Sequence, residues 1–280
     1  MVKALFRDIS ERLNGVSDSP DREAELIMEQ VYGRDVRLEL LKGRLDREPT
    51  QGELAKIDGI VTRRKSGEPL QYILGEWEFY GLGFKVTPAV LIPRADTEVL
   101  VDTALKLIDG IKAPRVLDLC SGTGCVALAI KSVRTDAEVS ALELYPEAFE
   151  VLKENIARHG GDVTPINSDA MRERTAADLV GFDLITANPP YLTAEDMENL
   201  QREVRSEPAT ALYGGNDGLD FYRELSRIWK NSLKDGGHIA YEIGWTQAED
   251  VAEILSANGY RDIEVKTDIE SRPRVVHARK

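Results

Sequence analysis

Residues 115–124 read RVLDLCSGTG and form the most informative segment of the chain. The apolar run through Leu119 predicts a buried strand. Gly122 and Gly124 then allow the backbone to turn closely around a ligand before a helix starts at about Cys125. A strand, a glycine turn and a helix in this order are typical of a nucleoside-binding unit at the carboxyl edge of a parallel sheet.

Strand-like and helix-like segments alternate around this unit. The strand-like segments are RVLDLC, EVSALEL, DVTPINSD, FDLITAN, HIAYEIG, DIEVKTD and RVVHAR. This order predicts a doubly wound, Rossmann-like α/β fold over residues 94–280, with a seven-stranded mixed sheet in which RVVHAR lies antiparallel beside DIEVKTD. Thr246 followed by Glu249 predicts a capping box at the start of the last helix.

The first 93 residues follow other patterns. Apolar residues recur at helical spacing over residues 1–74, so we expect a small all-α bundle there. Residues 75–93, GEWEFYGLGFKVTPAVLIP, are aromatic and β-branched residues interrupted by glycine and proline, which predicts a β-hairpin linker. We therefore expect a helical domain, a linker and an α/β domain that starts at residue 94.

Composition and charge narrow the function classes. Hydrophobic residues make up 42% and charged residues 30% of the 280 residues, as in soluble globular proteins. Residues 1–75 hold 13 Lys/Arg and 14 Asp/Glu, so the net charge of −13 falls almost wholly on residues 76–280. This acidity argues against duplex DNA as a substrate, because DNA binding depends on Lys and Arg that neutralise phosphates.

Other features predict a cytoplasmic protein without a metal. The chain has no run of about 18 apolar residues and no signal-peptide pattern, so we expect no membrane contact and a cytoplasmic location. The two cysteines, Cys120 and Cys125, have the spacing of neither a disulfide framework nor a metal site. We expect both to be reduced thiols.

The turn after the first strand of the α/β domain fits two nucleoside cofactors, a dinucleotide and S-adenosylmethionine. Asp118 at the strand end favours S-adenosylmethionine, because a carboxylate repels a pyrophosphate but can hold the amino-acid part of a sulfonium cofactor. Glu143 ends the second strand, where its carboxylate can accept hydrogen bonds from both ribose hydroxyls. Asp169 closes the third strand and either faces the adenine amine or caps the next segment.

Asn188-Pro189-Pro190-Tyr191 follows the fourth strand and would face the methyl donor if the first and fourth strands are neighbours. The Asn188 oxygen and the Pro189 carbonyl can each accept one N–H of a planar nitrogen, and the Tyr191 ring can lie against the planar group. Two prolines stiffen the loop, which helps to hold the nitrogen near the methyl group. Amides and aromatic amines fit these residues alike, and a plain turn is the alternative without function.

DLCSGTG together with the Asn-Pro-Pro-Tyr motif resembles the class I methyltransferases that modify planar nitrogens in DNA or in protein glutamine. Two further segments resemble the release-factor glutamine methyltransferase family, PrmC or HemK. They are GEWEFYGLGFKVTPAVLIPRADTE (residues 75–98) and EPATALYGGNDGLDFYR (residues 207–223). With the helical N-terminal part, the similarity covers essentially the whole chain.

The resemblance implies an activity, a substrate and a set of site residues. The activity is methyl transfer from S-adenosylmethionine, which leaves S-adenosylhomocysteine, to N5 of the glutamine in the Gly-Gly-Gln loop of peptide chain release factors. The resemblance assigns cofactor binding to residues 120–124 and to Glu143. Together with the residues that their positions alone indicate, the predicted cofactor site is Asp118, Cys120, Ser121, Gly122, Thr123, Gly124, Glu143, Asp169, Ala170 and Asn188. Glutamine binding falls to Arg94, Asn188, Pro189, Pro190 and Tyr191, of which Asn188, Pro189 and Tyr191 are the catalytic candidates. The bundle would contact the release factor away from that loop.

The chain departs from the family pattern at Cys120, which is often glycine, and at Ala170, where some members have an aromatic residue. The cysteine predicts a backbone conformation that is open to residues with side chains. Arg94 and Glu98 either shape the rim of the site or cap the helix that follows.

Two other functions compete with this one. An N6-adenine DNA methyltransferase is disfavoured, because a target-recognition domain is missing and residues 76–280 are acidic. A non-catalytic, cofactor-binding adaptor is disfavoured by the intact motif at residues 188–191.

Overall fold

The computed structural model describes residues 1–33 and 35–280, which divide into two compact units. The first unit comprises Met1–Glu76 and Gln201–Ser206, and the second comprises Trp77–Leu200 and Glu207–Lys280. The three-part division with boundaries after residues 74 and 93 stays a prediction. The structure adds that a short segment from the second half of the chain packs with the first unit.

The first unit is a bundle of helices around its own apolar core. Its helices are α1 (Val2–Leu13), α2 (Pro20–Tyr32), α3 (Val36–Leu41), α4 (Gln51–Lys65) and α5 (Leu70–Leu74). The core forms because residues such as Ile9, Ile27 and Ile57 lie on the buried faces of α1, α2 and α4. Arg64 is 2% exposed and its guanidinium donates to Glu23 and Glu203, so an ion-paired network holds residues 201–206 to the bundle.

The second unit holds a hairpin and a larger sheet. The strands are β1 (Glu76–Phe79), β2 (Leu82–Lys85), β3 (Arg115–Leu119), β4 (Glu138–Glu143), β5 (Val163–Asn167), β6 (Phe182–Ala187), β7 (Leu233–Glu242), β8 (Arg261–Thr267) and β9 (Pro273–Arg279). The helices are α6 (Glu98–Leu107), α7 (Cys125–Val133), α8 (Pro146–Arg158), α9 (Glu173–Asp178), α10 (Ala194–Glu198), α11 (Asp220–Ile228) and α12 (Ala248–Ala257). Short 3-10 turns lie at Ala95–Thr97, Ala209–Ala211 and Trp229–Ser232, and a further one at Val204–Ser206 belongs to the first unit.

The seven-stranded mixed sheet is confirmed, with the strand order β5-β4-β3-β6-β7-β9-β8. The strands β5, β4, β3, β6 and β7 are parallel to their neighbours, and β9 is antiparallel to both β7 and β8. The first and fourth strands of the prediction, β3 and β6, are neighbours, with Asp118 opposite Thr186. The order of strands in the sheet changes direction between β3 and β6, because β4 and β5 lie beyond β3 and β7 lies beyond β6. The two strands are parallel, so the loops that follow them leave the same edge of the sheet.

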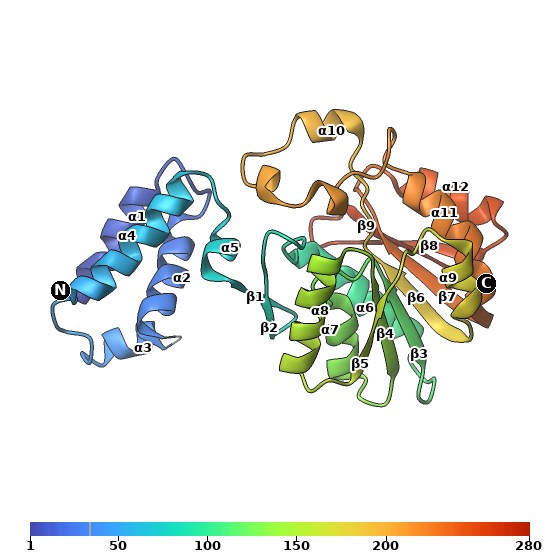
Figure 1. The fold of residues 1–280 in the computed structure, drawn as a ribbon, viewed down its shortest axis with the longest axis horizontal. Helices are drawn as coiled ribbons and strands as arrows, with labels where there is room; N and C mark the ends of the chain where they lie inside the picture. The colour runs from blue at the N-terminus through green and yellow to red at the C-terminus, as the bar shows by residue number, and fades with distance from the viewer. Residues whose placement is uncertain (34) are drawn as a thin grey trace. The chain divides into compact units, whose positions relative to one another are not determined.

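Helices cover both faces of the sheet (Figure 1). Helices α6, α7 and α8 pack on one face, and α9, α11 and α12 pack on the other. Along β3, Val116 belongs to the first of these cores, whereas Leu117 and Leu119 belong to the second. This alternation buries both faces and leaves only the strand ends for a site.

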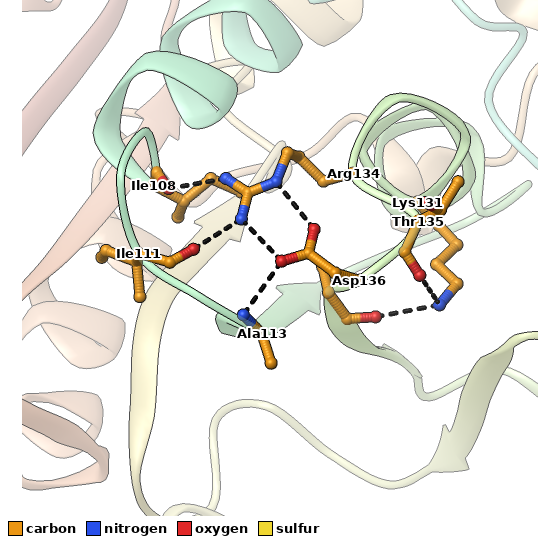
Figure 2. Close-up of polar contacts among 8 residues, drawn as sticks. Ile108, Ile111, Ala113, Lys131, Arg134, Thr135 and Asp136 are labelled. Carbon is orange, nitrogen blue, oxygen red and sulfur yellow. Dashed lines mark hydrogen bonds and ion pairs between the residues drawn. The ribbon is translucent and has the colours of Figure 1, made fainter.

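Polar contacts fasten the amino edge of the sheet, where Arg134 follows α7. Figure 2 shows its guanidinium donating to the carbonyls of Ile108, at 2.7 Å, and Ile111, and pairing with Asp136 at 2.9 Å. Asp136 also accepts a hydrogen bond from Ala113 N at 2.9 Å. The network ties the loop before β3 to the end of α7 and so fixes the start of the central strand.

The capping box expected at Thr246 is wrong. Helix α12 begins at Ala248 with Gln247 at its N-cap position and without a side-chain cap. The Gln247 side chain instead accepts from Gly244 N and donates to the carbonyls of Tyr191 and Gly218. Tertiary contacts of Gln247 therefore set this helix end.

The remaining structural expectations concern cysteines, metals and membranes. Cys120 and Cys125 are free, and burial raises the pKa of both thiols, that of Cys125 to about 12. Within residues 1–33 and 35–280, no cluster of three metal-ligating side chains occurs, and no helix is long and apolar enough to cross a bilayer.

Candidate active site

A cavity of about 300 Å³ lies at the carboxyl ends of β3, β4, β5 and β6. The loops after these strands, together with residues 89–97 and parts of 210–221, line it. The predicted site residues among its lining are Arg94, Asp118, Cys120, Ser121, Gly122, Thr123, Glu143, Asp169, Ala170, Asn188 and Pro190. The predicted residues Gly124, Pro189 and Tyr191 are not in the lining of this cavity.

Asp118 anchors the turn after β3. It is 2% exposed, and its two carboxylate oxygens accept hydrogen bonds from the hydroxyls of Ser121 and Thr186, the latter at 2.8 Å. Burial raises the pKa of Asp118 to about 7, and the two hydroxyl groups oppose that rise. The side chain predicted to hold a cofactor thus also fixes the shape of the turn.

The backbone at Cys120 corrects one expectation. Its φ is 55°, in the left-handed region that favours glycine, and not in a conformation open to any residue with a side chain. The turn therefore carries a local strain of about 1 kcal/mol relative to glycine. The half-buried cysteine side chain packs against the core that contains α9, α11 and α12.

Glu143 is held at the end of β4 by two backbone amides. Its Oε2 accepts from Gly122 N at 2.9 Å, and its Oε1 accepts from Tyr145 N at 3.0 Å. The carboxylate is 6% exposed and lines the cavity, and each oxygen retains a second lone pair. Glu143 thus joins the turns after β3 and β4 while it still offers acceptors to a ligand.

Asp169 both caps a turn and lines the cavity. Its Oδ1 accepts from Met171 N at 2.9 Å, and its other oxygen lies 3.2 Å from Arg172 Nε. The neighbouring Ala170 is 4% exposed, and its carbonyl accepts from the buried indole of Trp229 at 2.9 Å. The two alternatives for Asp169, a ligand contact and a cap, are compatible in this geometry.

The loop after β6 is clamped by the segment 212–218. Leu192 N donates to Leu212 O at 2.8 Å, and Gly214 N donates to Leu192 O at 2.9 Å. Asn188 faces the cavity, whereas Tyr191 packs against the core that contains α11 and α12. Of the four motif residues, Asn188 and Pro190 line the cavity, and Pro189 and Tyr191 lie outside its lining.

Comparisons with known proteins identify the family. The PrmC N-terminal domain matches residues 4–75, and the methyltransferase small domain matches residues 95–215. The release factor glutamine methyltransferase of Geobacter sulfurreducens is 44% identical over 231 residues, which cover 81% of this chain and 78% of the relative. That of Fusobacterium nucleatum is 38% identical over 270 residues, which cover 95% of this chain and 75% of the relative. The chain belongs to the release factor glutamine methyltransferase family.

The fold agrees with that membership. A methyltransferase from Pyrococcus furiosus, which is 17% identical, superposes with a TM-score of 0.51 over 72% of this chain and 90% of its own. At that identity the likeness shows the fold alone. The chain thus has the Rossmann-like fold of class I methyltransferases, with a helical region at its N-terminus.

Glu207 supports the site through Arg94, a role that the sequence did not predict. It is 6% exposed and accepts hydrogen bonds from the Arg94 guanidinium and, at 3.1 Å, from Ile92 N. Arg94 therefore lies on the cavity rim because Glu207 holds it there. Glu98, which was the other rim candidate, accepts from Tyr80 N at 3.0 Å and so contacts the hairpin.

Two glycines allow the segment 212–218 to pack against residues 188–192, the loop after β6 that we call the acceptor loop. A β-carbon at Gly214 would lie 2.5 Å from the Pro190 carbonyl oxygen, and one at Gly218 would lie 2.3 Å from the Tyr191 carbonyl oxygen. These glycines, like Glu207, lie in the segment 207–223 that carried the family resemblance. The sequence of that segment indicated that it matters for the family. It could not show these contacts, because the partners of Glu207, Gly214 and Gly218 lie elsewhere in the chain.

Proposed function

We propose that this chain transfers a methyl group from S-adenosylmethionine to the side-chain amide N5 of the glutamine in the Gly-Gly-Gln loop of peptide chain release factors. One observation carries the proposal. Three carboxylates that suit a cationic cofactor and the amide of Asn188 line the same cavity. Relatives named release factor glutamine methyltransferase support the substrate, because they align with most of the chain.

The side chains around the cavity suit S-adenosylmethionine. Its charged lining residues, within the described parts of the chain, are Asp118, Glu143, Asp169 and Arg94, and Arg94 is paired with Glu207. This balance favours a cationic ligand and disfavours the pyrophosphate of a dinucleotide. Glu143 would accept from the ribose hydroxyls, and Asp169 with Ala170 would lie on the adenine side.

The turn at residues 118–124 would complete the cofactor site. Asp118 would stabilise the positive charge of the amino-acid part, and residues Cys120 to Gly124 would approach the cofactor through their backbone. When bound, the cofactor would supply the methyl group. The protein then has to hold the acceptor nitrogen in line and keep water away.

The acceptor loop would bind the glutamine amide. Asn188 Oδ1 and the Pro189 carbonyl would each accept one N–H, and the Tyr191 ring would lie against the amide plane. Pro190 and Arg94 would bound the site. A loop that is stiffened by two prolines and clamped from behind can hold the nitrogen close to the methyl group, and proximity is a large term in catalysis.

The remaining parts of the chain would serve the protein substrate. Residues 1–74 would contact the release factor away from its Gly-Gly-Gln loop, because one glutamine side chain offers little area for selecting a protein. Residues 75–93 would link that domain to the methyltransferase domain. We also expect the chain to act in the cytoplasm, where release factors work.

Labelled S-adenosylmethionine tests the proposal. The purified chain would be given the labelled cofactor with a release factor, with the same factor whose Gly-Gly-Gln glutamine is replaced, or with duplex DNA. We expect label only in the unaltered release factor. Equal label in both release-factor samples would refute the glutamine assignment, and label in DNA would favour the adenine methyltransferase. Cofactor binding without transfer to any of these would favour the adaptor.

A further inference from the structure

Glu242 is a buried carboxylate behind the acceptor loop that the proposed chemistry does not use. It is the last residue of β7, is 3% exposed and is absent from the lining of the cavity. Its Oε2 has no hydrogen-bond partner among residues 1–33 and 35–280. Buried carboxylates without a full set of partners are costly, so the position requires an explanation.

The sheet brings Glu242 next to Asn188. Strands β6 and β7 are parallel with Ala187 opposite Tyr241, so Asn188 and Glu242 are the next residues along these two neighbouring strands. The Glu242 backbone is anchored as well, because the buried Tyr222 hydroxyl donates to its carbonyl at 2.9 Å. The Glu242 backbone is therefore held beside Asn188 at the end of the two strands.

Thr97 completes a polar cluster with these two residues. Asn188 Nδ2 lies 3.4 Å from Thr97 Oγ1, and both side chains line the cavity. Burial raises the pKa of Glu242 to about 7, and the interactions of its carboxylate with the Thr97 hydroxyl and the Asn188 amide oppose that rise. Beyond them, the charge of Asp96 raises it further and that of Arg274 lowers it.

The cluster bears on which end of the Asn188 amide faces the substrate. The two ends are nearly the same shape, but only the oxygen can accept an N–H from a glutamine amide. An ionised carboxylate can only accept, so it favours the amide orientation that turns Nδ2 toward it and leaves Oδ1 for the cavity. In the inverted orientation, Asn188 Oδ1 would face the carboxylate oxygens of Glu242, and both are acceptors. Asn188 Nδ2 would then face the substrate N–H, and both are donors.

We propose that Glu242 is a positioning residue that orients the Asn188 amide, with Nδ2 toward Glu242 and Thr97 and Oδ1 toward the substrate nitrogen. The inference rests on the proposed function, because it assigns a task to the same acceptor loop. Thr97 shares the contact, and Glu242 itself touches no substrate.

A reciprocal exchange of amide and carboxylate tests this inference. Asn188→Asp alone would place two carboxylates face to face, and at about pH 9, where Glu242 is ionised more fully, we expect kcat to fall by roughly 100-fold. Adding Glu242→Gln supplies a donor amide behind the introduced carboxylate, which frees its second oxygen to accept the substrate N–H. The double variant should therefore recover at least about tenfold in kcat over Asn188→Asp.

The controls separate this inference from the proposed function. The wild-type protein tests whether the release factor is methylated at all. If the wild type transfers no methyl group to the release factor, the proposed function itself is refuted. Calorimetric affinity for S-adenosylmethionine should stay close to the wild-type value in all variants, because each exchange preserves side-chain shape. The melting temperature of each variant shows that it is folded at the assay temperature. Glu253→Gln, on the exposed face of α12, is the matched control and should keep full activity.

Two outcomes would overturn the inference if the wild type is active. One is a double variant no more active than Asn188→Asp, which would show that Glu242 does not act through residue 188. The other is full activity of Asn188→Asp at about pH 9, which would show that the orientation of the amide is irrelevant to transfer.

Discussion

Gly214→Ala should slow methyl transfer through the position of the acceptor loop. Gly214 is buried and does not line the cavity, and its amide donates to Leu192 O at 2.9 Å. A β-carbon there would lie 2.5 Å from the Pro190 carbonyl oxygen and 2.6 Å from Tyr191 Cα. Both neighbours are backbone atoms, so a side-chain rotation cannot relieve the clash.

The size of the effect follows from these distances. Ordinary contact starts at about 3.4 Å, so the two backbones would have to separate by about 0.9 Å. Overpacking of this kind costs about 1–3 kcal/mol of stability. A displacement of about 1 Å at a reacting group can cost 100-fold in rate, so we expect kcat to fall by roughly 10- to 100-fold. The affinity for S-adenosylmethionine should change little, because the turn at residues 118–124 is not displaced.

Steady-state methylation of the release factor, calorimetry with S-adenosylmethionine and thermal melting would measure these effects. Gly59→Ala is the matched control, because Gly59 lies within α4 and a β-carbon there meets nothing within 4 Å. That variant should keep the wild-type affinity for S-adenosylmethionine and be more stable by about 0.5–1 kcal/mol. Wild-type kcat in Gly214→Ala would refute the reasoning, since the clash would then be absorbed without moving the loop.

Three further predictions concern the same site. Asn188→Ala should abolish turnover while the cofactor still binds, and loss of calorimetric affinity would contradict the role of Asn188 as a contact of the acceptor amide. Trp229→Phe removes the donor to Ala170 O and leaves space in the core, so chemical denaturation should show a loss of about 2–3 kcal/mol and calorimetry a weaker cofactor affinity; unchanged values for both would exclude this coupling. Glu242→Gln should gain stability relative to wild type as the pH rises from about 4.5 to 7, because burial raises the pKa of the folded carboxyl to about 7, so over that range the unfolded wild type releases a proton that the folded one still holds. The Asp118 contribution is common to both proteins, so a stability difference that does not change with pH would contradict this.

Local patterns were sufficient for the elements and their order. The apolar run before Gly122 predicted β3, and the alternating segments predicted the seven strands, including the antiparallel β9. Hydrophobic periodicity and turn residues act over a few positions, so they can be followed along the chain. The prediction that Asn188 faces the methyl donor depended on β3 and β6 being neighbours, and only the structure shows that they are.

Conformation and capping were less predictable. Cys120 has a left-handed backbone, although its residue type favours other conformations, because the turn must bring Ser121 to Asp118. Gln247, and not Thr246, is the N-cap residue of α12, and its side chain is committed to Tyr191 and Gly218. At Gln247 local propensity gave the wrong answer because contacts distant in sequence are stronger, whereas at Cys120 the contact lies within the turn itself, between Ser121 and Asp118.

The residue types of the motifs and the alternation of strands and helices were enough to predict the sheet, the nucleoside turn and the loop at Asn188. The support behind these residues depended on folding. Glu207 reaches Arg94 across 113 positions, and Glu242 meets Asn188 only because β6 and β7 are adjacent. Burial and hydrogen bonding at these pairs arise from the packing of separate segments. No local pattern records that packing, whereas the apolar periodicity of each segment is a property of the segment itself.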